Sequence, residues 1–352
     1  MTKKEIKGRG SSSDCPGRFE KTIKEPFDDG WEKDVEEPST ETIIKWDLAK
    51  SIINSNDSPD IPYEISINQY RGCEHGCIYC FARPSHSFLG LSPGLDFERK
   101  IFAKQDAVEL LKKELSNPNY KPTPVALGIN TDSYQPIERK LKITRNILEL
   151  LSSCQHPIWL VTKSALIERD IDILSEMAKK DLVEAAVSIT SLNPDITRKL
   201  EPRAANPQRR LKIISNLAKA GIPTTVLMAP IIPSVNDHEI ESILKSAKDA
   251  GASASGYVVL RLPHELPTVF KEWLETHMPD KSKKIMSQIK QIHGGKIYNS
   301  ESFTRHKGSG VLAKLIEKRF EVAMNKYDLK KPKKKELRCD IFIRPGQSGT
   351  LL

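Results

Sequence analysis

The chain has 352 residues, of which 38% are hydrophobic and 29% charged, and its formal net charge is +9. This length allows one large α/β domain or two smaller ones with a substantial core. It contains no run of about 18 apolar residues, which argues against a transmembrane helix. Its basic N-terminus is not followed by an apolar stretch, so no secretory signal is expected. We therefore expect the protein to be cytoplasmic, and thiols stay reduced in the cytoplasm.

Residues 1–60 predict an irregular N-terminal arm. Gly, Ser, Pro and acidic residues dominate this segment, and neither helical nor strand periodicity is strong. Embedded aromatic residues such as Phe19 indicate that the arm packs on the core.

Between residues 61 and 280, short strand-like runs alternate with longer helical stretches. The runs are residues 64–68, 125–130, 158–163, 183–190, 224–232 and 255–262. Repeated β–α units predict parallel strands with right-handed crossovers. The number of units fits a partial (β/α)6 barrel of the TIM type, with a doubly wound α/β sheet as the alternative. In both folds, functional groups gather at the carboxyl ends of the strands.

Residues 281–352 predict a helical C-terminal extension with a basic tail. The run LKKPKKKELR places lysines around Pro332, at positions 330, 331, 333, 334 and 335. Such a cluster is either a solvated loop or a surface that contacts phosphate groups. Without interleaved aromatic residues, such a surface would contact phosphate groups but would not distinguish one base sequence from another. A nucleic-acid partner therefore stays open, without a predicted sequence preference.

The stretch CEHGCIYC, after the first strand-like run, holds half of the six cysteines. Cys73, Cys77 and Cys80 have the spacing C-x3-C-x2-C. Thiolates bind zinc or iron–sulfur clusters, and a structural zinc site needs four ligands. Three thiolates on a four-iron cluster instead leave one iron open to a small molecule. His75 or His86 could complete a zinc site, so both metals stay open at this point.

The cysteine spacing, with the aromatic Tyr79 before the last cysteine, resembles the radical SAM superfamily. The wider stretches NQYRGCEHGCIYCFARPSH and GINTDSYQPIE resemble its spore photoproduct lyase-like branch, in particular an uncharacterised bacterial subfamily. The resemblance implies that Cys73, Cys77 and Cys80 hold a 4Fe–4S cluster whose free iron binds S-adenosylmethionine. A one-electron reductant of the flavodoxin or ferredoxin type would reduce it. The resulting 5′-deoxyadenosyl radical would take a hydrogen atom from an unknown substrate, for which nucleic acid is one candidate.

The resemblance also implies contacts to S-adenosylmethionine at or just after the strand ends. The implied contacts are Tyr79 for the adenine; Asn130, Thr131 and Asp132 for the methionine amino group; Lys163 and Arg203 for the carboxylate; and Ser188 and Thr190 for the ribose. Structural interpretations compete with several of these roles: a core ring, a turn that caps a helix, a solvated lysine, or an ion pair between Arg203 and Glu201.

Three residues are candidates for the substrate side. His264 and Glu265 follow the last strand-like run, and Tyr134 follows the second. Photoproduct lyase returns a hydrogen atom from a cysteine near its second strand, whereas no cysteine occurs here between Cys80 and Cys154. Tyr134 is the only comparable donor in that stretch, so repair of thymine dimers is not expected.

A non-enzymatic, zinc-stabilised nucleic-acid-binding protein is the competing hypothesis. It predicts one tightly held zinc ion per chain and nucleic-acid binding that weakens steeply with salt. The sequence leaves the substrate, the hydrogen-return donor and the oligomeric state open.

Overall fold

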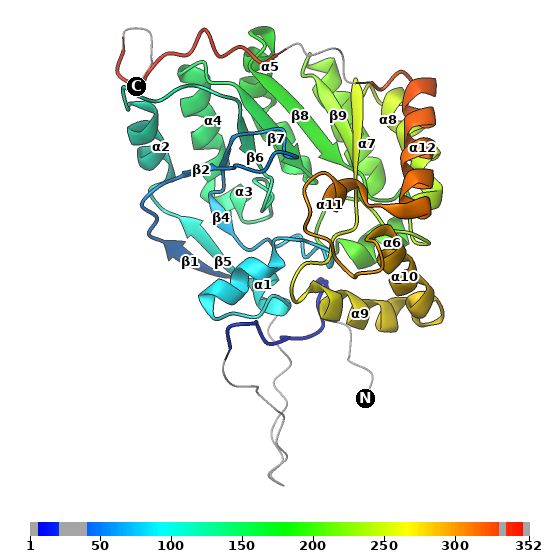
Figure 1. Cartoon of the computed structure of the whole chain (residues 1–352). Coiled ribbons are helices and arrows are strands. Elements are labelled where there is room, and N and C mark those ends of the chain that lie inside the picture. Colours follow the sequence, from blue (N-terminus) through cyan, green and yellow to red (C-terminus); the bar gives the residue numbers. More distant parts are fainter. Residues whose placement is uncertain (1–5, 21–40, 331–335, 348–352) are drawn as a thin grey trace.

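The computed structural model describes residues 6–20, 41–330 and 336–347 of the chain (Figure 1). Its larger sheet has the strand order β10-β9-β8-β7-β6-β3-β2. The strands are β2 (Ile53–Ser55), β3 (Ile65–Ile67), β6 (Val125–Leu127), β7 (Ile158–Thr162), β8 (Val183–Ser188), β9 (Thr224–Ile231) and β10 (Ala254–Val259). Neighbouring strands from β3 to β10 are parallel, and β2 pairs with β3 antiparallel at one edge.

The strand order decides between the two predicted folds. The parallel strands lie side by side in the order in which they follow one another along the chain. A doubly wound sheet would reverse that order at a switch point. The prediction of a partial (β/α)6 barrel is therefore confirmed, and each parallel strand lies at one of the predicted runs.

Helices connect the parallel strands. The longer crossover helices are α2 (Ala107–Leu115), α4 (Ile143–Ser153), α5 (Ile171–Lys179), α7 (Pro207–Lys219) and α8 (Ile240–Asp249). Shorter helical segments are η1 (Arg83–Leu89), α1 (Leu95–Arg99), α3 (Glu138–Leu141), η2 (Ala165–Asp170), α6 (Pro194–Leu200) and η3 (Asp237–Glu239). The start of α7 shows a local sequence cause: the Asn206 side chain accepts a hydrogen bond from the Arg209 amide at 2.8 Å, and Pro207 is the first helical residue.

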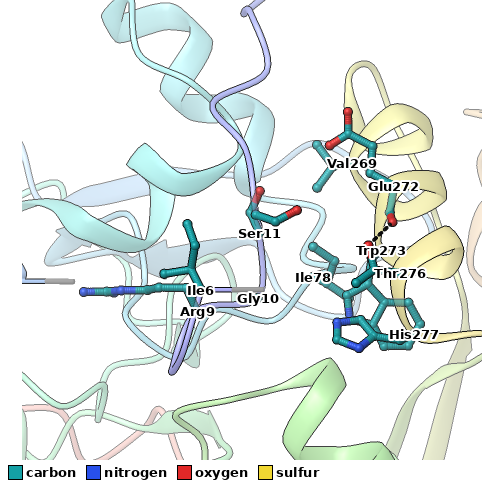
Figure 2. A pocket seen from close by; sticks show the side chains of 11 residues that line it. Ile6, Arg9, Gly10, Ser11, Ile78, Val269, Glu272, Trp273, Thr276 and His277 are labelled. Atoms are coloured by element: carbon teal, nitrogen blue, oxygen red, sulfur yellow. Dashed lines mark hydrogen bonds between the residues drawn. The ribbon is translucent and has the colours of Figure 1, made fainter. Parts of the chain in front are cut away.

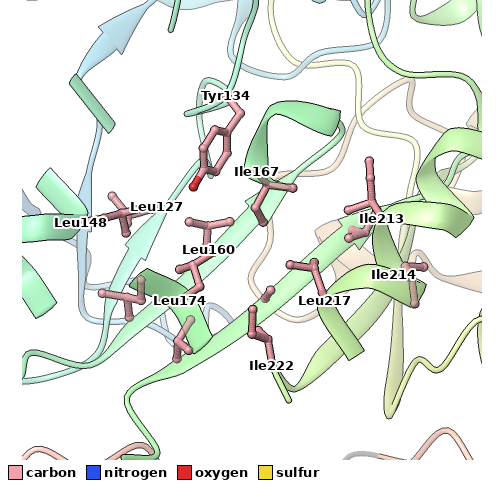
Figure 3. Packing of buried hydrophobic residues seen from close by; sticks show 14 of the residues in the cluster. Leu127, Tyr134, Leu148, Leu160, Ile167, Leu174, Ile213, Ile214, Leu217 and Ile222 are labelled. Atoms are coloured by element: carbon pink, nitrogen blue, oxygen red, sulfur yellow. The ribbon is translucent and has the colours of Figure 1, made fainter. Parts of the chain in front are cut away.

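Apolar side chains of the strands and crossover helices form the main core (Figure 3). Leu127 and Leu160 of the sheet lie in one cluster with Leu148, Leu174 and Leu217 of α4, α5 and α7. All five are fully buried. Full burial of one such side chain contributes about 1.5–3 kcal/mol. This packing fixes the strand ends relative to one another.

The N-terminal arm is more regular than predicted where the structure describes it. β1 (Ile43–Asp47) pairs in parallel with β5 (Lys100–Lys104), which also pairs with β4 (Tyr70–Arg71). These partners are distant in sequence, so local periodicity did not reveal β1. Phe19 packs against Phe88, with 5.0 Å between the ring centroids.

The helical extension of the predicted fold is present at the C-terminal side. Its helices are α9 (Leu266–His277) and α10 (Pro279–Ile292), which begin before the predicted boundary at residue 281, followed by α11 (Thr304–Lys307) and α12 (Gly310–Lys326). α10 packs against α9 and α12, and α12 packs against α8. Residues 331–335 of the predicted basic tail lie outside the described residues. Within the described part of the chain, no helix is long and apolar enough to cross a membrane.

Candidate functional site

The cysteine loop, residues 72–82, follows β3 and β4 at the carboxyl end of the first parallel strand. Its three cysteines are free thiols. Cys73 and Cys77 are buried, and Cys80 is partly exposed. The loop thus keeps its sulfur atoms at the sheet edge where the sequence predicts functional groups.

A buried ion pair between Arg83 and Glu98 holds the shape of this loop. The Arg83 guanidinium donates to the carbonyls of Cys77 at 2.9 Å and Gly76 at 3.1 Å. Gly76 adopts φ +67°, and a Cβ there would lie 2.7 Å from Glu98 Oε2, so this turn requires glycine. Side chains of the protein itself therefore fix the loop backbone.

The N-terminal segment docks on the same carboxylate. The amides of Gly10 and Ser11 donate to the two carboxylate oxygens of Glu98, both at 2.9 Å. A Cβ on Gly10 would lie 2.0 Å from the Gly76 carbonyl oxygen. The arm therefore crosses the loop at a contact between two glycines. Sequence reasoning missed this contact, for which the closely spaced glycines of KGRGSSSD were the available signal.

Figure 2 shows the arm beside Ile78 of the cysteine loop, with α9 on the other side of Ile78. Gly10 and Ser11 line a small pocket there together with Ile78 of the loop and Trp273 of α9. Cys15, which the sequence leaves apart from the other thiols, lies in the same apolar cluster as Ile78. The arm thus covers one side of the loop.

The surroundings of the thiols favour a cationic ligand. Burial raises the pKa of Cys73 well above its ordinary value, and the charges of Asp132 and of the other two loop thiols raise it further. Burial likewise raises the pKa of Cys77 to about 12, with Glu201 contributing. Thiolates form in such a place when a metal or cluster supplies positive charge. In the described residues, no group of three or more Cys, His, Asp or Glu side chains is placed so that it could hold a single metal ion.

Asp132, after β6, joins the ends of two neighbouring strands. Its carboxylate accepts hydrogen bonds from the Thr162 hydroxyl at 2.7 Å and from the Lys163 amide at 2.8 Å, both at the end of β7. Nε2 of His75 lies 3.4 Å from Asp132 Oδ2. The cysteine loop thereby meets the ends of the second and third parallel strands.

Glu201, directly after α6, binds two of the predicted cofactor contacts, Tyr79 and Thr190. Its buried carboxylate accepts hydrogen bonds from the Tyr79 hydroxyl, the Thr190 hydroxyl at 2.6 Å and the Arg210 guanidinium. Burial alone would raise the pKa of Glu201, but the charges of Arg210 and Lys163 lower it to about 2. Burial by itself would lower the pKa of Lys163. The negative charges of the Cys77 thiolate and Glu201 outweigh burial and raise this pKa above its ordinary value.

Arg203 does not pair with Glu201. Its guanidinium lies 3.3 Å from Glu74 and donates to the Thr42 hydroxyl at 3.4 Å. The interpretation of an Arg203–Glu201 pair is wrong, because Arg210 of α7 reaches Glu201 instead. Sequence reasoning missed this ion pair, since a contact between two elements across a turn has no periodic signal.

The remaining predicted cofactor contacts differ in their exposure and in the hydrogen bonds that they already make. Asn130 is exposed, whereas the Thr131 hydroxyl donates to the Tyr70 carbonyl at 3.1 Å. Ser188 is buried at the end of β8, and its carbonyl accepts from the Arg210 guanidinium at 3.0 Å. Asn130 therefore faces outward from the strand ends, and Thr131 is held by the backbone.

The structure separates the three candidate substrate-side residues. Tyr134 is fully buried in the main core (Figure 3). Glu265 accepts hydrogen bonds from the Arg18 guanidinium and the Ser87 hydroxyl, each at 3.1 Å, and so ties the arm and η1 to the start of α9. His264 is exposed and has φ +55°, a left-handed conformation that is unfavourable for a residue other than glycine. Tyr134 thus has a role in core packing and Glu265 a role in holding the arm and η1. Of the three candidates, His264 is the one whose side chain is exposed to solvent.

These residues fit an iron–sulfur cluster with a small-molecule site beside it. The three loop thiols supply the usual protein ligands of such a cluster. Within the described residues, both ring nitrogens of His75 are buried without a hydrogen-bond partner. Buried polar atoms in native proteins nearly always have a partner, so the loop is suited to a bound group that supplies one.

Comparison with known proteins gives related sequences and a related fold. A family model described as the Radical SAM superfamily matches residues 67–247, which include the cysteine loop and every predicted cofactor contact. An uncharacterized protein of Mycobacterium tuberculosis is 33% identical over 249 residues, which cover 70% of this chain and 72% of the relative. An uncharacterized protein of Methanocaldococcus jannaschii is 27% identical over 233 residues, which cover 66% of this chain and 82% of the relative.

Solved structures of spore photoproduct lyase share the fold. A point mutant of that enzyme superposes with a TM-score of 0.57 at 17% identity, over 81% of this chain and 79% of the lyase chain. The same lyase complexed with dinucleoside spore photoproduct superposes with a TM-score of 0.56 at 16% identity and the same coverage. Identity this low shows the shared fold alone.

Proposed function

The chain belongs to the radical SAM superfamily, and we propose that it is an enzyme in which Cys73, Cys77 and Cys80 hold a 4Fe–4S cluster that binds S-adenosylmethionine. When bound, the cluster would supply the electron that breaks the C5′–S bond of S-adenosylmethionine, and the resulting 5′-deoxyadenosyl radical would take a hydrogen atom from the substrate. The observation that carries the proposal is the buried thiol loop at the carboxyl edge of the partial barrel. A flavodoxin- or ferredoxin-type protein is the proposed electron donor.

Lys163 is the proposed partner of the S-adenosylmethionine carboxylate. It follows β7, and its ammonium interacts with the charges of a loop thiol and Glu201. Arg203 would have to leave Glu74 to bind the same carboxylate, which makes it the second choice. Asn130, exposed after the neighbouring strand β6, is proposed to contact the methionine amino group.

Tyr79 and Thr190 are proposed to position the adenosine part, with Ser188 beside them. The hydroxyls of Tyr79 and Thr190 both donate to Glu201, which holds the Tyr79 ring in one orientation next to the last loop cysteine. Polar groups fixed in this way need little reorganisation when a ligand binds.

Nucleic acid is the proposed substrate class. The Arg261 guanidinium, after β10, lies over the ring of Phe81 at 4.6 Å and makes no hydrogen bond or ion pair within the described residues. Phe81 follows the last loop cysteine and is 38% exposed. A guanidinium beside an exposed ring suits the phosphate and base of a single strand. The solved lyase complex holds a dinucleoside, and His264 is the proposed substrate-facing residue near this point.

Anaerobic reconstitution with iron and sulfide tests the cluster assignment. The expected product is a brown protein with a full 4Fe–4S cluster per chain. Cys77→Ala should lose this cluster while keeping its far-UV spectrum, because the loop contributes little to the main core. Cys154→Ala, which changes a buried thiol after α4, should retain the cluster. One zinc ion per chain without visible absorbance would contradict the proposal and revive the zinc-stabilised alternative, for which the comparisons give no support.

A further inference from the structure

His75 is a loop residue whose ring receives no hydrogen bond from the described part of the chain. His75 is 2% exposed, and neither of its ring nitrogens has a hydrogen-bond partner within the described residues. Asp132 Oδ2 lies 3.4 Å from Nε2, but outside hydrogen-bond geometry. The Asp132 carboxylate already accepts from the Thr162 hydroxyl and the Lys163 amide.

A buried imidazole in this state is costly. A buried donor or acceptor that has lost water without gaining a hydrogen bond destabilises the folded state. A small movement of the ring would give one nitrogen to Asp132 and leave the other without a partner. The other charged groups that face the ring are Lys163, Glu201 and Arg210, and the last two are bonded to each other. At least one ring nitrogen therefore needs an atom that the folded chain does not supply.

The position of His75 indicates where such an atom would come from. The residue lies two positions after Cys73 and two before Cys77. Its carbonyl accepts a hydrogen bond from the Arg203 amide at 3.3 Å, which holds it in place between the two cysteines. A cluster held by both cysteines would lie beside this residue, and its sulfide and thiolate sulfurs would accept hydrogen bonds.

We propose that His75 donates a ring N–H to a sulfur atom of the iron–sulfur cluster and thereby raises its reduction potential. The inference rests on the proposed function, since it requires the cluster. An N–H that points at sulfur stabilises the additional negative charge of the reduced cluster, so its removal makes reduction harder. His75 acts through the cluster and is a positioning residue: it neither ligates iron nor touches the substrate.

A redox titration of the reconstituted protein without S-adenosylmethionine, followed by EPR, tests this role. His75→Leu should shift the reduction equilibrium about tenfold toward the oxidised cluster, which is about 59 mV for one electron. His75→Asn keeps a side-chain N–H and should lie between His75→Leu and the unchanged protein. His156→Leu is the matched control, because it removes a buried imidazole just before β7, at the amino-terminal end of the parallel strands and away from the cysteine loop. Its potential should stay unchanged.

An unchanged potential in His75→Leu would overturn the inference. This includes the case in which only S-adenosylmethionine binding weakens, since the ring would then serve that cofactor. A second measurement needs no variant: in protein labelled with 15N-histidine, pulsed EPR of the reduced cluster should detect a weakly coupled nitrogen. A cluster without this coupling contradicts the role of His75 alone, whereas a chain that assembles no cluster contradicts the proposed function as well.

Discussion

Glu201 accepts hydrogen bonds from Tyr79, Thr190 and Arg210 in a buried part of the site. Removing one partner of a buried ion pair leaves the other charge uncompensated and costs about 3–5 kcal/mol. The carboxylate that orients Tyr79 therefore also stabilises the fold locally. Its role became visible only in the structure, where α6 and α7 bring Glu201 and Arg210 together.

Acid should weaken the fold through Glu201. Its pKa in the folded state is about 2, against an ordinary value of 4.5. A lowered folded-state pKa gives stability that is present above the unfolded-state pKa and is lost as the pH falls through the folded-state pKa. The difference corresponds to about 3 kcal/mol, lost as the pH falls from about 4.5 to about 2. Urea unfolding should show this loss, and Glu201→Gln should flatten it. Equal acid sensitivity of both proteins would contradict the role of Glu201.

Lys163→Ala should weaken S-adenosylmethionine binding about tenfold to a hundredfold, because hydrogen bonds to charged groups contribute about 1.5–3 kcal/mol. Isothermal titration of the reconstituted protein measures this change, and the visible absorbance of the cluster should stay the same. Lys245→Ala, which removes an exposed lysine paired with Asp249, is the control. Undiminished affinity in Lys163→Ala would remove this residue from the site.

Elements differ in how far they could be predicted. Strand runs such as residues 158–163 and the stretch CEHGCIYC are local patterns, so the partial barrel and its cysteine loop could be read from the sequence. β1 and β2 pair with segments that follow them in the chain, and short exposed strands have little periodicity of their own. Tyr134 shows the reverse case: it lies near a strand end, as expected of a donor, but the fold buries it in the core.

Gly10→Ala should detach the arm from the cysteine loop. The new Cβ would lie 2.0 Å from the Gly76 carbonyl oxygen, so the arm has to move and lose its amide bonds to Glu98. Limited proteolysis should then cut within residues 9–18 faster, and the cluster should be lost faster in air. Ser12→Ala, two positions further along, should behave like the unchanged protein. Equal rates in all three proteins would show that the arm does not protect the loop.

At the scale of the whole molecule, the loops after the first and the last parallel strand meet at the carboxyl edge of the barrel, although four strands separate β3 from β10 in the sheet. Phe81, in the loop after β3, lies under Arg261, which follows β10. The thiol loop thus lies next to the one guanidinium singled out in the substrate proposal. Neither neighbour could be predicted from local sequence, because each belongs to a different end of the strand series.

This edge should bind single-stranded nucleic acid, aided by the net charge of +9. Fluorescence anisotropy with a labelled oligonucleotide should show affinity that falls with salt. Arg261→Ala should reduce the slope of log affinity against log salt by about 0.7, the value for one phosphate contact on a single strand. Lys179→Ala, which removes an exposed lysine paired with Glu176, is the control. An unchanged slope in Arg261→Ala would contradict the substrate proposal without touching the cofactor chemistry.

Release of 5′-deoxyadenosine tests the proposed chemistry most directly. The reconstituted protein, reduced and incubated anaerobically with S-adenosylmethionine, should release 5′-deoxyadenosine and methionine in equal amounts. Cys80→Ala should release neither. A protein that carries the full cluster and binds S-adenosylmethionine, yet releases no 5′-deoxyadenosine after reduction, would contradict radical SAM catalysis by this chain.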